Sequence, residues 1–285
     1  MLDRRATFWA LLLPPLLWLG IFFVAPLLLM AAISFRADLS GEMLRPWVPT
    51  LVQYADLARV GSYWRLLGIS ALVALMIAMS ATALAYPISY YLVFRAGSQA
   101  NLYLLLLLIP FWTSYLLRVM AWKFMLGSGG VINSFLLYTG LIQQPLTALL
   151  YNRSAVVLTL IYVWIPFAAL PIVAALQRIE LSLFEAADDL GATPARRFWR
   201  VTFPLSLPGV LAAFFMVFIP TVGEYVTPLL VGGSRGSLYG NIIQDFFTKA
   251  GNWPFGSALS MIMLVFTLLL VALALRVVDL RRLVV

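Results

Sequence analysis

Long apolar runs alternate with shorter polar segments along this chain. A run of roughly 18 or more apolar residues can cross the ~30 Å hydrocarbon layer of a bilayer as a helix. Prolines lie inside several of the runs, and each frees backbone groups that neighbouring helices or cavity water must satisfy. The pattern therefore predicts an all-α integral membrane protein with an internal path. Its six transmembrane helices are expected at residues 10–33, 66–94, 103–122, 154–176, 207–231 and 256–277.

The composition agrees with a membrane protein and excludes several kinds of chemistry. Hydrophobic residues make up 63% of the chain and charged residues 11%, whereas a soluble globular chain has about 25% charged residues. Cysteine and histidine are both missing, which excludes disulfides, thiol nucleophiles, histidine-based triads and thiolate or imidazole metal sites. We expect no catalytic residue and no metal site. A membrane enzyme is correspondingly disfavoured.

The distribution of charge predicts the orientation in the membrane. The net charge is +8, but the arginines mostly flank apolar runs, so we expect anionic lipid rather than nucleic acid to meet them. Six spans place both termini on one face. Arginine is denser in the termini and in connections 95–102 and 177–206 than in connections 34–65, 123–153 and 232–255. Both termini are therefore expected in the cytoplasm, and the longer connections are expected to form short helices on the outer face.

The connection at 177–206 is long and charged. Residues 181–190 fit a helix of nearly three turns, with Leu183, Phe184, Ala187 and Leu190 available as an apolar stripe. Gly191 is a typical stop, and Thr193 followed by Pro194 is a typical restart. Four acids and four arginines cancel, so the loop is no polybasic lipid anchor. It is either a solvated charged loop or a docking element for a protein, and the helix–glycine–helix order favours docking.

The sequence Glu185-Ala186-Ala187, followed by Gly191 and Pro204, resembles the EAA loop of ABC importer permeases. Phe203 stands before Pro204, where many relatives have leucine. The resemblance implies a type I permease fold in one domain over residues 1–285, in a bacterial inner membrane, with the loop as a coupling helix in a groove of the ATPase. The residues that this resemblance assigns to ATPase coupling are Phe184, Glu185, Ala186, Ala187, Asp188, Leu190, Gly191 and Arg197.

Two further stretches, residues 110–133 and 222–260, resemble the spermidine/putrescine branch of that family. This implies ATP-driven polyamine import by alternating access; an opine, amino-acid-like or other small solute is the alternative. No phosphate-binding loop of the Walker type occurs, so ATP and Mg²⁺ are expected on a partner ATPase dimer and no cofactor on this chain. The implied partners also include a second, different permease subunit and a periplasmic or surface solute-binding protein. An ion channel would need no docking loop.

Glu224 is the candidate acid of the translocation path. It follows Pro208 by 16 residues, which places it ~24 Å along the helix, where nearby prolines and a glycine suggest an opened helix. An ionisable group at membrane depth usually faces a cavity or a partner. The alternatives are an ion pair with Arg118 or a carboxylate in outer-face water. Asp245 is a second candidate, with a solvated outer helix as its alternative. The aromatic candidates for cation–π contact with an ammonium group, which otherwise belong to the interfacial belt, are Trp112, Tyr115 and Tyr225.

Overall fold

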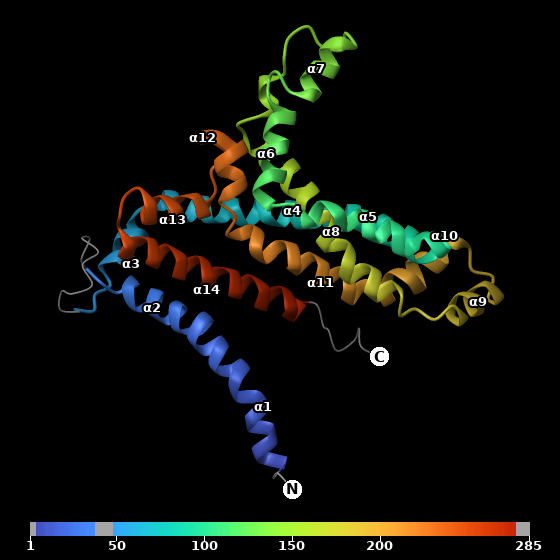
Figure 1. Cartoon of the computed structure of the whole chain (residues 1–285), viewed down its shortest axis with the longest axis horizontal. Coiled ribbons are helices and arrows are strands. Elements are labelled where there is room, and N and C mark those ends of the chain that lie inside the picture. Colours follow the sequence, from blue (N-terminus) through green and yellow to red (C-terminus); the bar gives the residue numbers. More distant parts are fainter. Residues whose placement is uncertain (1–3, 38–47, 278–285) are drawn as a thin grey trace. The chain divides into compact units, whose positions relative to one another are not determined.

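The structure is a computed structural model that describes residues 4–37 and 48–277. These residues fold into helices joined by turns, and their one β-bridge pairs Arg36 with Pro49. They fall into two compact units: residues 4–37, 48–64 and 242–266 form the first, and residues 65–241 and 267–277 form the second. Figure 1 labels the helices in chain order. Both chain ends lie outside the described residues, and so does the prediction that the termini face the cytoplasm.

The first unit contains the first apolar run, the short helix α3 and parts of α13 and α14. Helices α1 (Arg4–Leu19) and α2 (Ala25–Ser34) are joined by a π turn at Gly20–Val24, and α3 spans Val52–Arg59. The buried Ser34 hydroxyl bonds to the Tyr54 hydroxyl at 2.7 Å, which ties α3 to the end of α2. The unit also holds residues 242–248 of α13 (Tyr239–Thr248) and the first part of α14 (Trp253–Val277).

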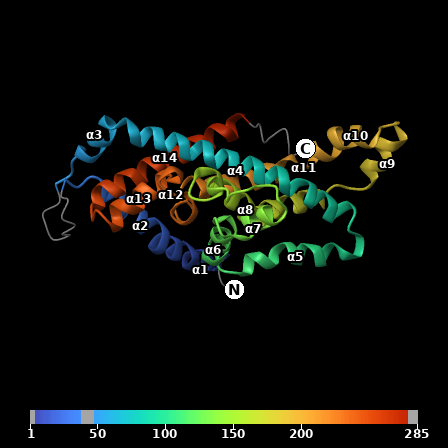
Figure 2. The same cartoon turned by 90° about the horizontal axis from the view of Figure 1, so that it is seen from above.

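The second unit is a helix bundle whose core is α4 (Gly61–Phe94, from residue 65 on), α8 (Arg153–Leu176) and α11 (Phe203–Val222). Helices α8 and α11 run side by side in both views (Figure 1, Figure 2). Small residues let these backbones approach closely: Ala74, Ala78, Ala81 and Ala85 form one buried face of α4. On the same helix, the Ser89 hydroxyl donates to the Ala169 carbonyl of α8 at 3.2 Å.

The remaining helices of the second unit are short. They are a 3₁₀ turn at Gly97–Gln99, α5 (Ala100–Trp112), α6 (Tyr115–Leu126), α7 (Val131–Tyr138), a 3₁₀ turn at Thr147–Leu149, α9 (Ser182–Asp189), α10 (Pro194–Arg197), π turns at Phe198–Thr202 and Pro228–Gly232, and α12 (Gly233–Gly236).

Five helices among the described residues are long and apolar enough to span a membrane. They are Phe8–Ser34, Gly61–Phe94, Arg153–Leu176, Pro194–Val222 and Trp253–Arg276. Four of these agree with predicted spans to within a few residues. The number rises to six if the bent pair α5–α6 crosses as one span.

The predicted span at 103–122 is bent in the structure, and whether it crosses as one span stays a prediction. The helix stops at Trp112 and resumes at Tyr115, and the segments on either side of this break meet at 88°. Thr113 takes an extended backbone (φ −80°, ψ 151°), and its hydroxyl donates to the Pro110 carbonyl at 2.6 Å. These local bonds end α5 and let α6 start in a new direction.

The boundaries of the fifth span also differ from the prediction of 207–231. The helix begins at Pro194 and ends at Val222, so Pro204 and Pro208 do not separate the loop from the span. The reason is the π turn at Phe198–Thr202, in which the Phe203 amide donates to the Phe198 carbonyl. Pro204, which has no amide hydrogen, then occupies the first turn of α11, where none is needed.

Candidate functional site

The charged loop folds as a helix, a turn and a second helix. Helix α9 ends at Asp189, and Gly191, two residues further on, has a left-handed backbone (φ 72°). The amides of Gly191 and Ala192 donate to the carbonyls of Asp188 and Ala187 at 2.9 and 3.0 Å, which closes the C-terminus of α9. Thr193 then caps α10, because its hydroxyl accepts from the Arg196 amide at 3.3 Å. The predicted stop and restart are both present.

Arg197 holds the two short helices together. Its guanidinium donates to the Asp188 carboxylate at 2.5 Å and lies over the Phe184 ring, with Cζ 5.2 Å from the ring centroid. The Asp188 side chain is about half exposed, so screening by water leaves this ion pair a modest contribution to stability. Its geometric effect is to fix α10 against α9.

The four residues of the predicted apolar stripe of α9 do not all face the same way. Leu183 and Leu190 are exposed, Leu190 to 88%, whereas Phe184 and Ala187 are half-buried. Glu185 and Ala186 are exposed beside Leu190. The loop therefore presents a free surface of leucines, one alanine and a carboxylate, while its only aromatic ring within α9 turns toward the rest of the second unit.

Glu224 lies at a break in the helix rather than within it. Helix α11 ends at Val222, so Glu224 lies in the opened segment that the nearby prolines and glycine indicate. The Glu224 Oε1 atom accepts from the amides of Val226 and Thr227 at 2.8 and 3.0 Å. These bonds satisfy amides at the start of the turn that follows. The carboxylate is thus fixed in place by backbone and is half-buried.

Side chains of α6 lie next to this break. The Tyr115 hydroxyl bonds to the hydroxyl of the buried Thr227 at 2.6 Å, and both Glu224 and Arg118 are electrostatic neighbours of that Tyr115 hydroxyl. Arg118 lies over two rings, with Cζ 5.8 Å from the Phe111 centroid and 6.0 Å from the Tyr115 centroid. Within the described part of the chain, Glu224 forms no ion pair within 4 Å with Arg118 or any other cation.

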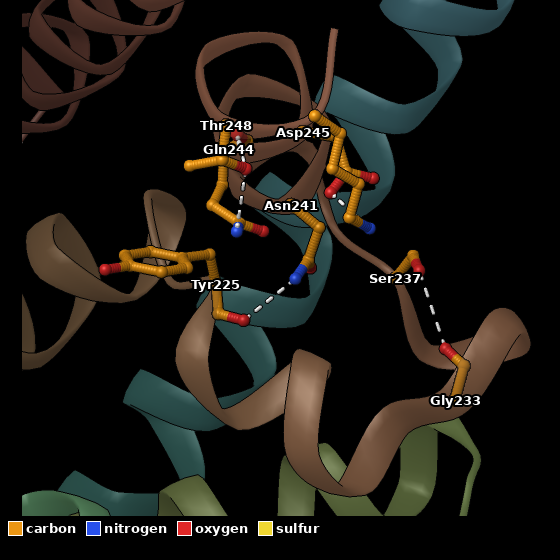
Figure 3. Close-up of polar contacts among 8 residues, drawn as sticks. Tyr225, Gly233, Ser237, Asn241, Gln244, Asp245 and Thr248 are labelled. Atoms are coloured by element: carbon orange, nitrogen blue, oxygen red, sulfur yellow. Dashed lines mark hydrogen bonds and ion pairs between the residues drawn. The ribbon is translucent and has the colours of Figure 1, made fainter.

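The start of α13 packs on the same break. The Asn241 amide donates to the Tyr225 carbonyl at 2.8 Å, and Figure 3 shows the Tyr225 ring pointing away from Asn241. The Asn241 Oδ1 atom accepts from the Leu238 amide at 2.9 Å. A Cβ at Gly240 would come within 2.7 Å of the Gly223 carbonyl oxygen. The break is therefore held by a close backbone contact that requires glycine.

The other candidates for the path lie in different surroundings. Trp112, at the end of α5, is 74% exposed, and Tyr225 is 43% exposed. Asp245 pairs with Lys249 one turn along α13 at 2.8 Å, with the lysine 67% exposed. That exposed pair matches the solvated-helix alternative for Asp245. The role of each of these three residues in the path stays a prediction.

Sequence reasoning missed Thr227, Asn241 and Gly240, which build the break around Glu224. Their partners lie up to 112 residues away, and no local pattern marks them. It also missed Tyr86, Tyr90 and Phe94 at the end of α4, whose rings meet the charged loop. For these three, the aromatic spacing along α4 is the one signal that the sequence offers.

The chain combines a bundle of apolar spans, a fixed carboxylate at a helix break and a folded charged loop between two spans. Together these features are those of a multi-pass membrane permease. Comparison with known proteins gives the family. The model of the binding-protein-dependent transport system inner membrane components matches residues 4–283. The chain therefore belongs to this family of inner membrane permeases.

Curated relatives match most of the chain. The spermidine/putrescine transport system permease protein PotB of Salmonella typhimurium (strain SL1344) is 34% identical over 243 residues, covering 85% of this chain and 84% of the relative. PotB of Escherichia coli K12 is 33% identical over 243 residues, covering 85% and 87%. The inner membrane ABC transporter permease protein YdcU of E. coli K12 is 30% identical over 275 residues, covering 92% and 87%.

Solved structures confirm the fold. A chain in the crystal structure of a bacterial alginate ABC transporter, in complex with an alginate pentasaccharide-bound periplasmic protein, superposes with a TM-score of 0.70. The match covers 95% of this chain and 93% of that chain at 17% identity. The type I permease fold expected from the EAA loop is thus present.

Proposed function

We propose that this chain is the permease subunit of an ATP-driven importer for polyamines such as spermidine and putrescine. The observation that supports this substrate class is the 33–34% identity to PotB permeases over 85% of the chain. A match of that length includes both the charged loop and the break at Glu224, wherever in the chain it begins. We place the whole permease domain at residues 1–285.

The chemistry of the break fits a cationic substrate. Backbone amides hold Glu224 Oε1, so the carboxylate is ordered before any substrate arrives. A preorganised carboxylate in a site of low dielectric attracts an ammonium group more strongly than one in water does. Tyr115, Tyr225 and Trp112 offer rings for cation–π contact with the ammonium groups, and Asp245 is a further acid for the path.

Membership of the permease family supports the proposed partners. An ATPase dimer, which binds ATP and Mg²⁺, docks on the charged loop. The loop residues proposed for ATPase coupling are Phe184, Glu185, Ala186, Ala187, Asp188, Leu190, Gly191 and Arg197. A second, different permease chain completes the path. A solute-binding protein delivers the substrate at the outer face. Both termini lie in the cytoplasm, so the loop and the ATPase are on the same side.

Uptake of labelled spermidine by the complete importer, with and without Glu224→Gln, tests the substrate proposal. Glutamine keeps an oxygen for the Val226 and Thr227 amides, so the variant removes charge while preserving the cap. Loss of one charge-assisted contact is expected to lower uptake at limiting spermidine at least ~10-fold. The matched control is Asp56→Asn on α3, whose carboxylate forms an exposed 3.5 Å pair with Arg59; uptake should stay within about two-fold of wild type.

Two results would contradict the proposal. An equal loss of uptake and of complex assembly in Glu224→Gln would make the carboxylate structural. Wild-type uptake of an opine or amino-acid-like solute, with no polyamine uptake, would move the substrate class and leave the family assignment unchanged.

A further inference from the structure

Six aromatic rings connect the charged loop to the C-terminal part of α4. They come from three parts of the second unit that are far apart in sequence: the end of α4, helix α9, and the π turn with the start of α11. Each ring has its neighbour's centroid within 6 Å. We call this set the aromatic ladder: Phe184, Phe94, Tyr90, Phe198, Tyr86 and Phe203.

The first contact of the ladder joins the loop to a span. The Phe184 centroid lies 5.3 Å from that of Phe94, the last residue of α4, at an interplanar angle of 59°. Phe184 is half-buried, in contrast to its exposed neighbours Leu183 and Glu185. Arg197 covers Phe184 from α10. Phe184 therefore points toward the spans, away from the free surface of α9.

The ladder continues from Phe94 to the start of the fifth span. Tyr90 lies 5.0 Å from Phe94 and 5.9 Å from Phe198. Tyr86 meets Phe198 edge-to-face at 5.8 Å, and its hydroxyl bonds to the hydroxyl of the buried Ser206 at 2.8 Å. The end of α4 is thus fastened both to α9 and to the start of α11.

The connectivity of the chain shows which helices can follow a movement of α9 without side-chain contacts and which cannot. From α9 the backbone leads to α8 in one direction and to α10 and α11 in the other. A displacement of α9 therefore reaches α8 and α11 through covalent bonds. Helix α4 lies two spans earlier in the chain, so the same displacement reaches it through side-chain contact. Packed side chains transmit such movements because they resist compression.

We propose that the Phe184–Phe94 contact transmits movement of helix α9 to span α4, so that Phe184 acts as a positioning residue for the spans instead of contacting the ATPase. This inference rests on the proposed docking of the ATPase on α9. The inference gives Phe184 a different role from the exposed residues of α9, so substitutions at the two kinds of position should have different effects. Loss of an exposed residue should detach the ATPase, whereas loss of either ring should leave it attached and uncoupled from transport.

The test uses the complete importer reconstituted in proteoliposomes with its ATPase and its loaded binding protein. For Phe184→Ala, Phe94→Ala and the double variant, three quantities are measured: ATPase retained through purification, ATP hydrolysed, and substrate taken up per ATP. We expect full ATPase retention and an uptake per ATP that falls about two- to ten-fold, the range that one aromatic pair supports. The double variant should equal either single variant, because each removes the same contact.

Two further variants keep the test specific. Phe94→Tyr preserves the ring and should restore uptake per ATP. Tyr91→Ala removes a 51% exposed ring that lies next to Tyr103 of α5 on another side of α4, and uptake per ATP should stay at the wild-type value.

The outcomes distinguish this inference from the docking proposal. Unchanged uptake per ATP in Phe94→Ala would overturn the transmission role, as would loss of the ATPase from that variant, which would show that the ring merely holds the loop in its fold. Glu185→Lys, on the exposed face of α9, is expected to lose the ATPase. ATPase retained by Glu185→Lys would refute docking on this face, whatever Phe94→Ala shows.

Discussion

Gly240 is the residue on which the geometry around Glu224 depends most directly. An added Cβ would lie 2.7 Å from the Gly223 carbonyl oxygen and 2.9 Å from that of Glu224. Because both atoms are backbone, neither can rotate away. Gly240→Ala must therefore move the start of α13 off the break.

We expect Gly240→Ala to destabilise the protein by about 1–3 kcal/mol, seen as a lower melting temperature of the purified chain in detergent. Gly68→Ala is the matched control, since its new Cβ would meet no atom within 4 Å and alanine favours a helix. Its melting temperature should be unchanged or higher. Equal melting temperatures for Gly240→Ala and wild type would contradict this prediction, because they would show that the start of α13 can move without a loss of stability.

At this scale the sequence predicts what depends on near neighbours. Gly191 and Thr193 occupy the expected ends of the loop helices, because capping bonds reach at most a few residues along the chain. The direction of Phe184 was beyond prediction, since it depends on Phe94, ninety positions earlier in the chain. Glu224 was correctly placed near an opened helix, but its cap required knowledge of where α11 ends.

Among the elements, the crossing of α8 and α11 depends on one small residue. A Cβ at Gly209 would lie 2.4 Å from the Ala175 Cβ and 2.6 Å from the Pro171 carbonyl oxygen. These two helices form the largest contact in the second unit. A larger residue at Gly209 must separate them.

We expect Gly209→Val to lower the amount of folded permease in membranes, with a cost of about 1–3 kcal/mol from overpacking. Detergent extraction followed by size-exclusion chromatography measures the folded fraction. Ala175→Gly should restore part of it, because it removes one of the two clashes. Ala212→Val, on the exposed side of α11, should leave the folded fraction at the wild-type value; a loss as large as that of Gly209→Val would rule out the crossing as its cause.

Hydropathy predicts the spans better than their shapes. Four of the six predicted segments coincide with long helices, because burial in hydrocarbon is set by apolar length. The 88° bend after Trp112 leaves hydropathy unchanged, since the residues on both sides are apolar. Pro110 and the Thr113–Ser114 pair were the local signals, and their weight was underestimated because proline is common in membrane helices.

For the whole molecule, the bent pair α5–α6 decides the topology. If the pair crosses the membrane as one span, the turn at 97–99 and the charged loop lie on the same face, because α8 crosses back. If the pair re-enters and returns, the two lie on opposite faces. The chain contains no cysteine, so single cysteines can be introduced without any background substitution.

We expect a membrane-impermeant maleimide to label Tyr138→Cys in intact spheroplasts, and to label Ser98→Cys and Leu190→Cys only after permeabilisation. Tyr138 is 91% exposed and Leu190 88% exposed, so the reagent reaches both sites in the chain expressed without its partners. The physical reason is that α8 is one continuous apolar helix and so must change sides. Tyr138 and Leu190 therefore react from opposite faces in either topology, which makes them an internal control.

The labelling of Ser98→Cys distinguishes the two topologies. If it is labelled from the face opposite to Leu190→Cys, the pair α5–α6 does not cross the membrane. The six-span arrangement would then be replaced by five spans with a re-entrant helix pair.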